Sequence, residues 1–470
     1  MSSLPDVVRE CVAGEVIAAY KPRSVSSVYV ICEPPCEQKC GGVNIVTEEE
    51  FLGDVQAATL GEIVASTLLA PPEMLYGDES LVEEAMTTYH YRVLLEEHKR
   101  LRKMLGRLSE RAIVSVVYHL FARASRIQRF YPWAGHGLVE ALAKEPRKLV
   151  ALSARILEEA GCKPQGTVAG LCTSSSISRR GWKLSTARLT RLWPLVRPGG
   201  SDHPLLKDPL LLVRLDKARL RTKLMRFEDQ AYRVASIARA LETIRRGIGG
   251  TVTIHYSRFK SIIVKRYLTP ATAKWIIAAG AALPIYPYRL TPRSRLEAEY
   301  IAVSSMLDLG LPVPQPILVD PRGLKAAYEY IEGTPLHQII SKDPVPPAMA
   351  SAGALLAEVH KKGWVVGDAN PSNFIVGRER VYLVDLEQAM QASSLRYRAW
   401  DLAVLVYYSF LFNPREPGKR AAMVARAYIE AGGERDVVKE AAKTVYTVPF
   451  VAIAPVTVLD KARKALLHSV

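Results

Sequence analysis

The sequence predicts an α+β protein with two or three domains, because three stretches of its 470 residues differ in pattern. Residues 55–160 show mostly helical spacing of apolar residues, whereas strand-like and helix-like runs alternate from about residue 227 onward. Between them lies a stretch interrupted by Gly, Ser and Pro. We therefore expect a mostly helical N-terminal α/β domain over 1–170, a linking segment over 171–226 and a second α+β domain over 227–470.

Composition sets the broad class. Hydrophobic residues make up 49% of the chain and charged residues 23%, which is typical of globular proteins and excludes a largely disordered or collagen-like chain. No apolar run approaches the roughly 18–20 residues that span a bilayer, so no membrane insertion is expected. The first residues lack the apolar core of a secretory signal. The expected location is the cytoplasm.

The N-terminal stretch begins with a predicted helix over 7–19 and two short strands over 27–31 and 43–46. Longer helices are predicted over 83–108, 113–129 and 138–160. The opening order is compatible with a degenerate nucleotidyltransferase-like fold, or with a helical scaffold. Nucleotidyl transfer requires carboxylates on neighbouring strands, but Ser26 to Tyr29 stand where they would fall.

Three of the six cysteines, Cys32, Cys36 and Cys40, form the run CEPPCEQKC. This spacing is not a standard zinc motif, and no fourth ligand is evident. The alternatives are a zinc or iron–sulfur site, free thiols in a loop, or a local disulfide. Disulfides are uncommon in the cytosol except in hyperthermophiles.

Positive charge is concentrated in the middle of the chain. The net charge is +16, and residues 171–226 hold 13 Lys and Arg against 3 Asp. Such an excess favours an anionic partner, namely RNA, DNA or a membrane surface. A solvated linker is the alternative.

The most informative stretch is HKKGWVVGDANPSNFIVGRERVYLVDLEQA, from His360 to Ala389. Asp368 and Asn373 lie five residues apart, and Asp385 ends the apolar run VYLVD. A turn between two short strands would bring these three groups together. Phosphoryl transfer from ATP uses such a set, in which one carboxylate faces the acceptor hydroxyl and an amide and a second carboxylate hold Mg²⁺.

This stretch resembles the protein-kinase-like superfamily. VVGDANPSNFIV is similar to the catalytic loop, and LVDLE is similar to the metal-binding segment. The resemblance implies a two-lobed kinase-like domain that binds ATP and Mg²⁺, with Asp368 as catalytic base and Asn373 and Asp385 as metal ligands. Arg398-Ala-Trp-Asp401 resembles the motif whose aspartate braces the catalytic loop from a buried helix.

The resemblance extends upstream. SIIVKRY places Lys265 at the end of an apolar strand, like the lysine that contacts the α- and β-phosphates. The predicted helix over 295–309 would supply its carboxylate partner. Glu299 fits best by its spacing to Gly310, and Glu297 is the second choice.

Two further parts of a nucleotide site are implied. AAYEYIEG resembles the hinge between lobes, where Glu329 to Ile331 would offer backbone groups to adenine. Gly247, Gly249 and Gly250 precede a strand, and their N–H groups would cradle phosphates. The full glycine-loop pattern is absent, so a plain β-turn fits this stretch equally well.

The sequence departs from the pattern of ordinary protein kinases in two ways, and these departures narrow the choice of family. Too few residues separate Asp385 from Asp401 for a full activation segment, and Leu386-Glu387 stands where many kinases have Phe-Gly. The chain is therefore more similar to the atypical families: RIO kinases, KEOPS-complex kinases, lipopolysaccharide kinases and aminoglycoside-type phosphotransferases. The expected function is that of a RIO-like serine/threonine protein kinase, with RNA or a ribosomal or tRNA-modification protein as partner. A pseudokinase that acts by binding, and a small-molecule kinase, are the alternatives.

Overall fold

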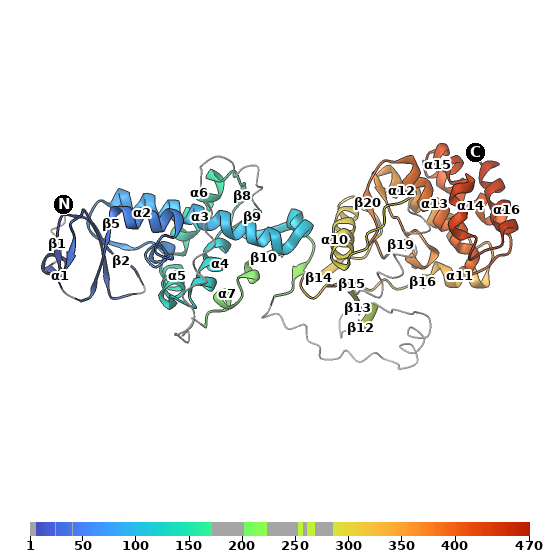
Figure 1. The fold of residues 1–470 in the computed structure, drawn as a ribbon. Coiled ribbons are helices and arrows are strands. Elements are labelled where there is room, and N and C mark those ends of the chain that lie inside the picture. Colours follow the sequence, from blue (N-terminus) through green and yellow to red (C-terminus); the bar gives the residue numbers. More distant parts are fainter. Residues whose placement is uncertain are drawn as a thin grey trace. The chain divides into compact units, whose positions relative to one another are not determined.

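A computed structural model describes residues 6–23, 25–39, 41–171, 202–222, 252–256, 261–267 and 285–470. The chain forms two compact units (Figure 1). Unit 1 comprises residues 1–215 and 222–225, and unit 2 comprises residues 216–221 and 226–470. Both units combine helices with sheets, as an α+β class requires. The division of the chain at 170 and 226 stays a prediction, since only residues 171 and 202–222 of the basic segment are described.

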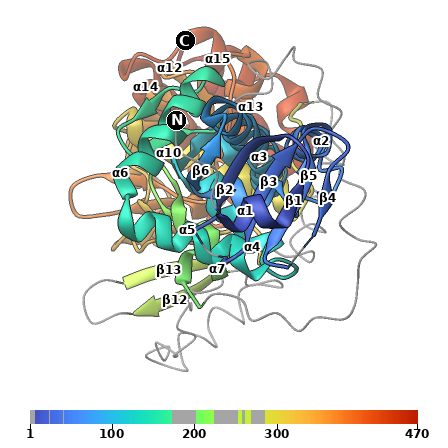
Figure 2. The same cartoon turned by 90° about the vertical axis from the view of Figure 1, so that its left-hand side faces the viewer.

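Unit 1 begins with a four-stranded sheet in the order β5-β3-β2-β6 (Figure 2). Strands β3 and β5 run parallel, while β2 is antiparallel to both β3 and β6. The bounds are β2 Val16–Lys21, β3 Val28–Cys32, β5 Val43–Thr47 and β6 Glu73–Gly77. Helix α2 (Glu48–Ala57) follows β5 directly, because Thr47 and Glu50 form a reciprocal capping box.

The predicted helix over 7–19 is wrong beyond its first turns. Helix α1 spans Asp6–Cys11, and the chain then enters β1 (Val12–Ala13), which pairs with β4 (Glu37–Gln38). Gly14 explains the change, because its φ of +137° is incompatible with a continuing helix. A Cβ there would also lie 2.8 Å from the carbonyl oxygen of Pro35.

The remainder of unit 1 is built around one long helix, α3 (Glu79–Leu105), which packs against α4 (Tyr118–Ile127). The predicted helix over 113–129 is only partly correct, because it starts with strand β7 (Ala112–Ser115). The predicted helix over 138–160 is two helices, since Pro146 cannot continue the first and begins the second. They are α5 (Pro132–Lys144) and α6 (Pro146–Glu159), and the other elements are β8 (Pro164–Gln165), β9 (Val168–Gly170), α7 (Pro204–Lys207) and β10 (Val213–Leu215).

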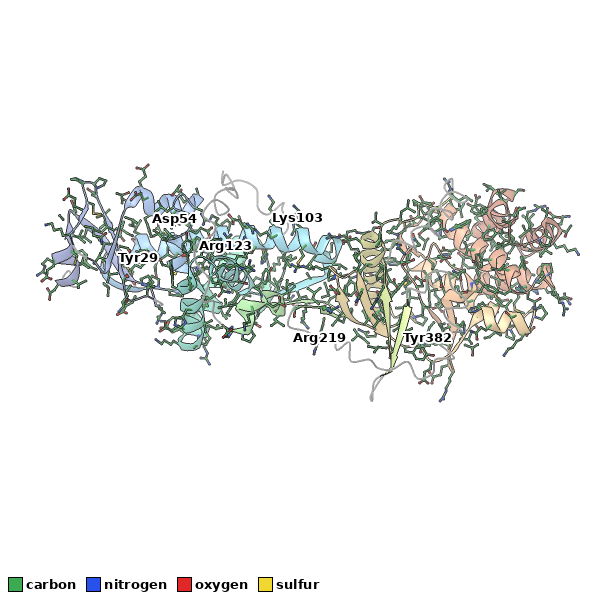
Figure 3. The ribbon with its side chains drawn as sticks, turned by 60° about the horizontal axis from the view of Figure 1, so that its bottom comes forward. Tyr29, Asp54, Lys103, Arg123, Arg219 and Tyr382 are labelled. Carbon is green, nitrogen blue, oxygen red and sulfur yellow. A yellow bond between two sulfur atoms is a disulfide. The ribbon has the colours of Figure 1, made fainter. Side chains whose placement is uncertain are left out.

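Two buried charged groups organise the interior of unit 1 (Figure 3). The carboxylate of Asp54 accepts four backbone N–H bonds of 2.8–3.0 Å. The donors are Leu60, Glu62, Val64 and Ala65. Arg123, which is 1% exposed, pairs with Glu62, Glu96 and Glu97. The charge of each group is thereby compensated, as burial demands.

The cysteine run contains a disulfide, not a thiolate cluster. Cys32 is bonded to Cys36, while Cys40 lies outside the described residues. Cys11 and Cys162 are also disulfide-bonded. A metal site that uses the thiolates of both Cys32 and Cys36 is therefore not formed in this structure.

Unit 2 begins with a five-stranded sheet in the order β11-β14-β15-β13-β12. Its edge strand β11 (Arg219–Leu220) comes from the basic segment and pairs parallel to β14, whereas the other pairs are antiparallel. The bounds are β12 Val252–Tyr256, β13 Ser261–Arg266, β14 Pro316–Asp320 and β15 Lys325–Glu329. The predicted helix over 227–244 lies outside the described residues.

Helices dominate the rest of unit 2. Helices α12 (Ala348–Lys361), α14 (Pro417–Glu430) and α16 (Val456–Leu467) pack in succession, and α13 (Leu395–Tyr408) packs against α15 (Arg435–Ala441). Unit 2 also contains two small sheets, with the strand orders β16-β18-β19 and β17-β20. The remaining bounds are α10 Pro292–Asp308, α11 Leu336–Lys342, β16 Thr334–Pro335, β17 Trp364–Val365, β18 Phe374–Val376, β19 Val381–Leu383 and β20 Met390–Gln391. Among the described residues, every helix is too short or too polar to cross a bilayer.

Replacing Asp54 with Asn is expected to destabilise the full-length protein by about 2–4 kcal/mol. The amide offers one acceptor oxygen instead of two, and its NH₂ group faces backbone donors. Urea unfolding followed by far-UV circular dichroism measures the change. The matched control is Glu49→Gln, on the exposed side of α2. Equal stability of the two variants would contradict the structural role of Asp54.

Candidate functional site

The site is organised around Lys265, near the end of β13. This strand lies between β12 and β15, and the Lys265 side chain is buried, with the residue only 6% exposed. Its Nζ lies 2.7 Å from Oε2 of Glu299 and 3.2 Å from Oε2 of Glu387, and it also contacts Oδ1 of Asp385. One buried ammonium thus joins three carboxylates.

Helix α10 supplies Glu299. Its start is set by Thr291, whose side chain accepts the N–H of Ser294, and by a proline in the first turn. The structure pairs Lys265 with Glu299 and not with the second choice, Glu297, which bonds to Arg293 at 2.8 Å. The hydroxyl of Tyr267 also donates to Glu299 Oε2, at 2.6 Å.

Glu387 is a site residue that the sequence interpretation did not include. Its carboxylate is buried, and it accepts hydrogen bonds of 3.3 Å from Arg295 Nη1 at both oxygens. Arg295 lies one turn before Glu299 on α10. The sequence did show an acidic residue at this position, where many kinases have Gly. It did not show that the Glu387 side chain is buried.

Burial acts on the pKa values of this cluster. It raises the pKa of Glu299 to about 7, although Lys265 works in the opposite direction. Burial alone would lower the pKa of Lys265, but Asp385, Glu299 and Glu387 together raise it well above its ordinary value. The three carboxylates thus favour the charged form of Lys265.

Asp401 holds the loop that carries Asp368. It lies on α13, is fully buried, and accepts the N–H groups of Val366 and Gly367 at 2.6 Å each. His360 Nε2 lies 3.1 Å from the same carboxylate. The bracing role implied by the sequence resemblance is confirmed by these contacts.

Within this loop, short polar contacts orient the proposed catalytic residues. Asn370 Nδ2 donates to Asp368 Oδ1 at 2.9 Å, and Asn373 Nδ2 donates to the Asp368 carbonyl oxygen at 2.8 Å. The N–H of Val384 donates to the carbonyl oxygen of Asn373 at 2.9 Å, which brings Asn373 beside the segment of Asp385. The three residues are thus brought into neighbouring segments, as a metal and acceptor site would need.

Carboxylate oxygens of Glu299, Asp385 and Glu387 all lie within 4.8 Å of one another, but the ammonium of Lys265 occupies the space between them. Of these three, Asp385 is the one whose carboxylate could also face a divalent cation from the accessible side, and hard oxygen ligands suit Mg²⁺. Asp385 is the accessible member, because its side chain is 34% exposed. Its φ of +60° is uncommon for a residue other than Gly, and such backbone conformations concentrate at functional sites.

The remaining predicted nucleotide contacts are only partly described. Glu329 ends β15, and its N–H already donates to the Gln315 carbonyl at 2.9 Å, so an adenine contact by Glu329 would not use that N–H. Ile331 follows in the connection to β16. The three glycines of the proposed phosphate loop lie outside the described residues.

A segment before α10 also packs against the loop of Asp368 and the segment after Asp385, and it had no sequence signal. Tyr288 donates to the Gly367 carbonyl at 3.2 Å, and Tyr286 donates to the Gln388 carbonyl at 2.7 Å. Gly367 has a φ of +79°, and a Cβ there would meet the Tyr286 ring at 2.6 Å. Only glycine fits this position.

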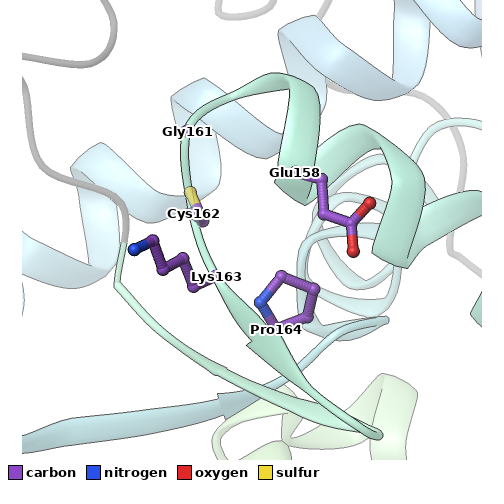
Figure 4. A pocket seen from close by; sticks show the side chains of 5 residues that line it. All are labelled: Glu158, Gly161, Cys162, Lys163 and Pro164. Atoms are coloured by element: carbon purple, nitrogen blue, oxygen red, sulfur yellow. The ribbon is translucent and has the colours of Figure 1, made fainter.

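A shallow hollow in unit 1 has none of these features. It lies where α6 leads into β8, with Glu158 and Lys163 on opposite sides (Figure 4). Cys162 in its wall is disulfide-bonded. This hollow is not a candidate active site.

Comparison with known proteins finds partial sequence similarity to proteins of one type. A probable serine/threonine-protein kinase BUD32 homologue from Archaeoglobus fulgidus is 27% identical over 150 residues, which cover 32% of this chain and 72% of that protein. The chain is a partial relative of the atypical, Bud32-type protein kinases. A second relative of this type, the KEOPS complex subunit Bud32 of Pyrococcus abyssi, is 27% identical over 136 residues, or 59% of its length.

Longer proteins also match a part of this chain. A probable bifunctional tRNA threonylcarbamoyladenosine biosynthesis protein from Methanosarcina mazei is 37% identical over 93 residues, which cover 20% of this chain and 16% of that protein. The chain thus spans less than a fifth of that bifunctional protein. No protein-family model matches the chain.

Asp401→Asn is expected to lower the free energy of unfolding by about 2–4 kcal/mol, because a buried amide cannot accept both loop N–H bonds while facing His360. Thermal or urea unfolding of the full chain measures this loss. Asp436→Asn, on the exposed surface of α15, is the matched control. If both variants unfold like the wild type, Asp401 does not brace the loop.

Proposed function

We propose that unit 2 is an ATP-dependent phosphotransferase of the atypical serine/threonine protein kinase type. The observation that carries the proposal is the cluster of Lys265, Glu299 and Asp385 beside the loop of Asp368 and Asn373. In it, a buried strand lysine, a helix carboxylate and an accessible carboxylate meet in one place, which is the arrangement that phosphoryl transfer requires.

Each residue has a distinct role in this proposal. Lys265 binds the α- and β-phosphates, and Glu299 holds the lysine in position. Asp385 and Asn373 hold Mg²⁺, which neutralises charge on the phosphates. Asp368 accepts the proton of the acceptor hydroxyl while the new oxygen–phosphorus bond forms and the bond to the ADP oxygen breaks.

We infer further that the protein acts in tRNA modification. The names of its relatives support this, since they include a KEOPS complex subunit and tRNA threonylcarbamoyladenosine biosynthesis proteins. The basic segment 171–226 offers the positive charge that an RNA backbone would require. A cytoplasmic location stays a prediction.

Substitution of the two aspartates is expected to separate binding from chemistry. Asp385→Ala removes a metal ligand and should weaken Mg²⁺-dependent ATP binding at least about tenfold. Asp368→Ala should bind Mg·ATP within about threefold of wild type yet lose transfer by about 10²-fold or more. Calorimetry measures binding, and release of labelled phosphate or autophosphorylation measures transfer.

Asp436→Ala, far from the loop in sequence and exposed, serves as the control for this pair. If the wild type binds Mg·ATP but transfers no phosphoryl group to water, protein or small acceptors, the protein is a pseudokinase and the proposed transfer activity is wrong. A hydroxylamine-sensitive label lost in Asp385→Ala would instead identify an aspartyl phosphate as in RIO-type enzymes.

Binding of an unmodified tRNA transcript is expected to depend steeply on salt. Four phosphate contacts would reduce affinity about 100-fold between about 50 and 200 mM salt. Charge reversal at Arg179, Arg180, Lys183 and Arg188 should weaken binding further, and filter binding with the full chain measures both effects. The matched control replaces the same three arginines with lysine, which keeps the positive charge of the segment. Salt-independent binding would remove the RNA proposal.

A further inference from the structure

The three carboxylates around Lys265 are not equivalent. The side chains of Glu299 and Glu387 are 5% and 6% exposed, whereas that of Asp385 is 34% exposed. Lys265 is therefore held from the buried side by two glutamates and from the accessible side by Asp385. Among these carboxylates, Asp385 is therefore the one that can leave Lys265 for another cation with the least change in the burial of its side chain.

Glu387 has an anchor of its own. Arg295, with a side chain 1% exposed, donates to both of its oxygens at 3.3 Å. The cluster thus contains two buried cations and three carboxylates. Because Arg295 belongs to α10, Glu387 links this helix to the segment that follows β19 independently of Glu299.

We propose that Glu387 is a positioning residue that keeps Lys265 in place when Asp385 leaves the lysine to serve as a metal ligand. The inference rests on the proposed function, because it assumes that Asp385 binds Mg²⁺. With Glu387 present, the lysine loses one of three carboxylates in this exchange. With only Glu299 left, the buried ammonium would hold Asp385 more strongly, since an underpaired buried charge is costly.

This arrangement predicts a specific defect. Glu387→Gln keeps the size of the side chain but removes its charge, so Lys265 competes better for Asp385. The Mg²⁺ concentration that half-saturates nucleotide binding should rise about tenfold, measured with the full chain and fluorescent N-methylanthraniloyl-ADP. The turnover number at saturating Mg²⁺ should fall less than threefold. Glu379→Gln, exposed in the β18–β19 hairpin, should match the wild type.

A double-mutant cycle separates positioning from a general charge effect. In a Lys265→Met background, Glu387→Gln should shift the Mg²⁺ requirement less than twofold, because its partner is gone. If Lys265→Met fails to fold by circular dichroism, Glu299→Gln takes its place. The Mg²⁺ requirement of the double variant Glu299→Gln/Glu387→Gln should then rise by more than the product of the rises in the two single variants. The reason is that Asp385 is the carboxylate left for the lysine in this cluster.

The outcomes are distinct. An unchanged Mg²⁺ requirement in Glu387→Gln overturns the inference while the proposed function stands. An equal shift with and without Lys265 also overturns it, because Glu387 would then act on the metal through its charge alone. A wild type that binds no Mg·nucleotide overturns the proposed function, and the inference with it.

Discussion

Unit 2 depends on one interaction, the burial of the Lys265 ammonium of β13 among carboxylates from two other parts of the chain, α10 and the segment after β19. Strand β13, helix α10 and the segment after β19 must stay together, because separating any of them would leave a buried charge poorly compensated. Removing one partner of such a pair typically costs about 3–5 kcal/mol. The sheet and the helical part are thereby linked by electrostatics at the point where chemistry would occur, in addition to apolar packing.

The same principle governs the loop of Asp368. Its irregular backbone cannot satisfy its own N–H groups, so a buried carboxylate on α13 does so, and an asparagine within the loop bonds back to it. Two positions with left-handed backbone, Gly367 and Asp385, flank this polar core. The loop geometry thus rests on hydrogen bonds to charged and amide groups, and the hydroxyl of Tyr288 adds a bond to the Gly367 carbonyl oxygen.

Much of this could be predicted from local pattern. An apolar strand ending in Lys265, a capped helix with Glu299 and the run before Asp385 each carry their signal within a few residues. Glu387 could not be recognised, because an acidic residue after a strand is usually solvated and its burial depends on Arg295, some ninety residues earlier. The end of α1 at Cys11 was missed since apolar spacing continued past Gly14, where backbone geometry decides. The positive charge of the basic segment favoured an anionic partner, with a solvated linker as the alternative, and neither interpretation predicted the strand β11.

That strand extends unit 2 upstream of residue 227. Residues 216–221 belong to unit 2: β11 pairs with β14, Lys217 bonds to Asp308 at 2.6 Å, and Arg221 bonds to Asp320 at 3.0 Å. A fragment started at residue 227, where the sequence pattern changes, would strip the strand from this edge of the sheet. An unpaired edge invites pairing with another molecule. Such a fragment would therefore aggregate through β14, whereas one that starts before Asp216 would keep the edge covered.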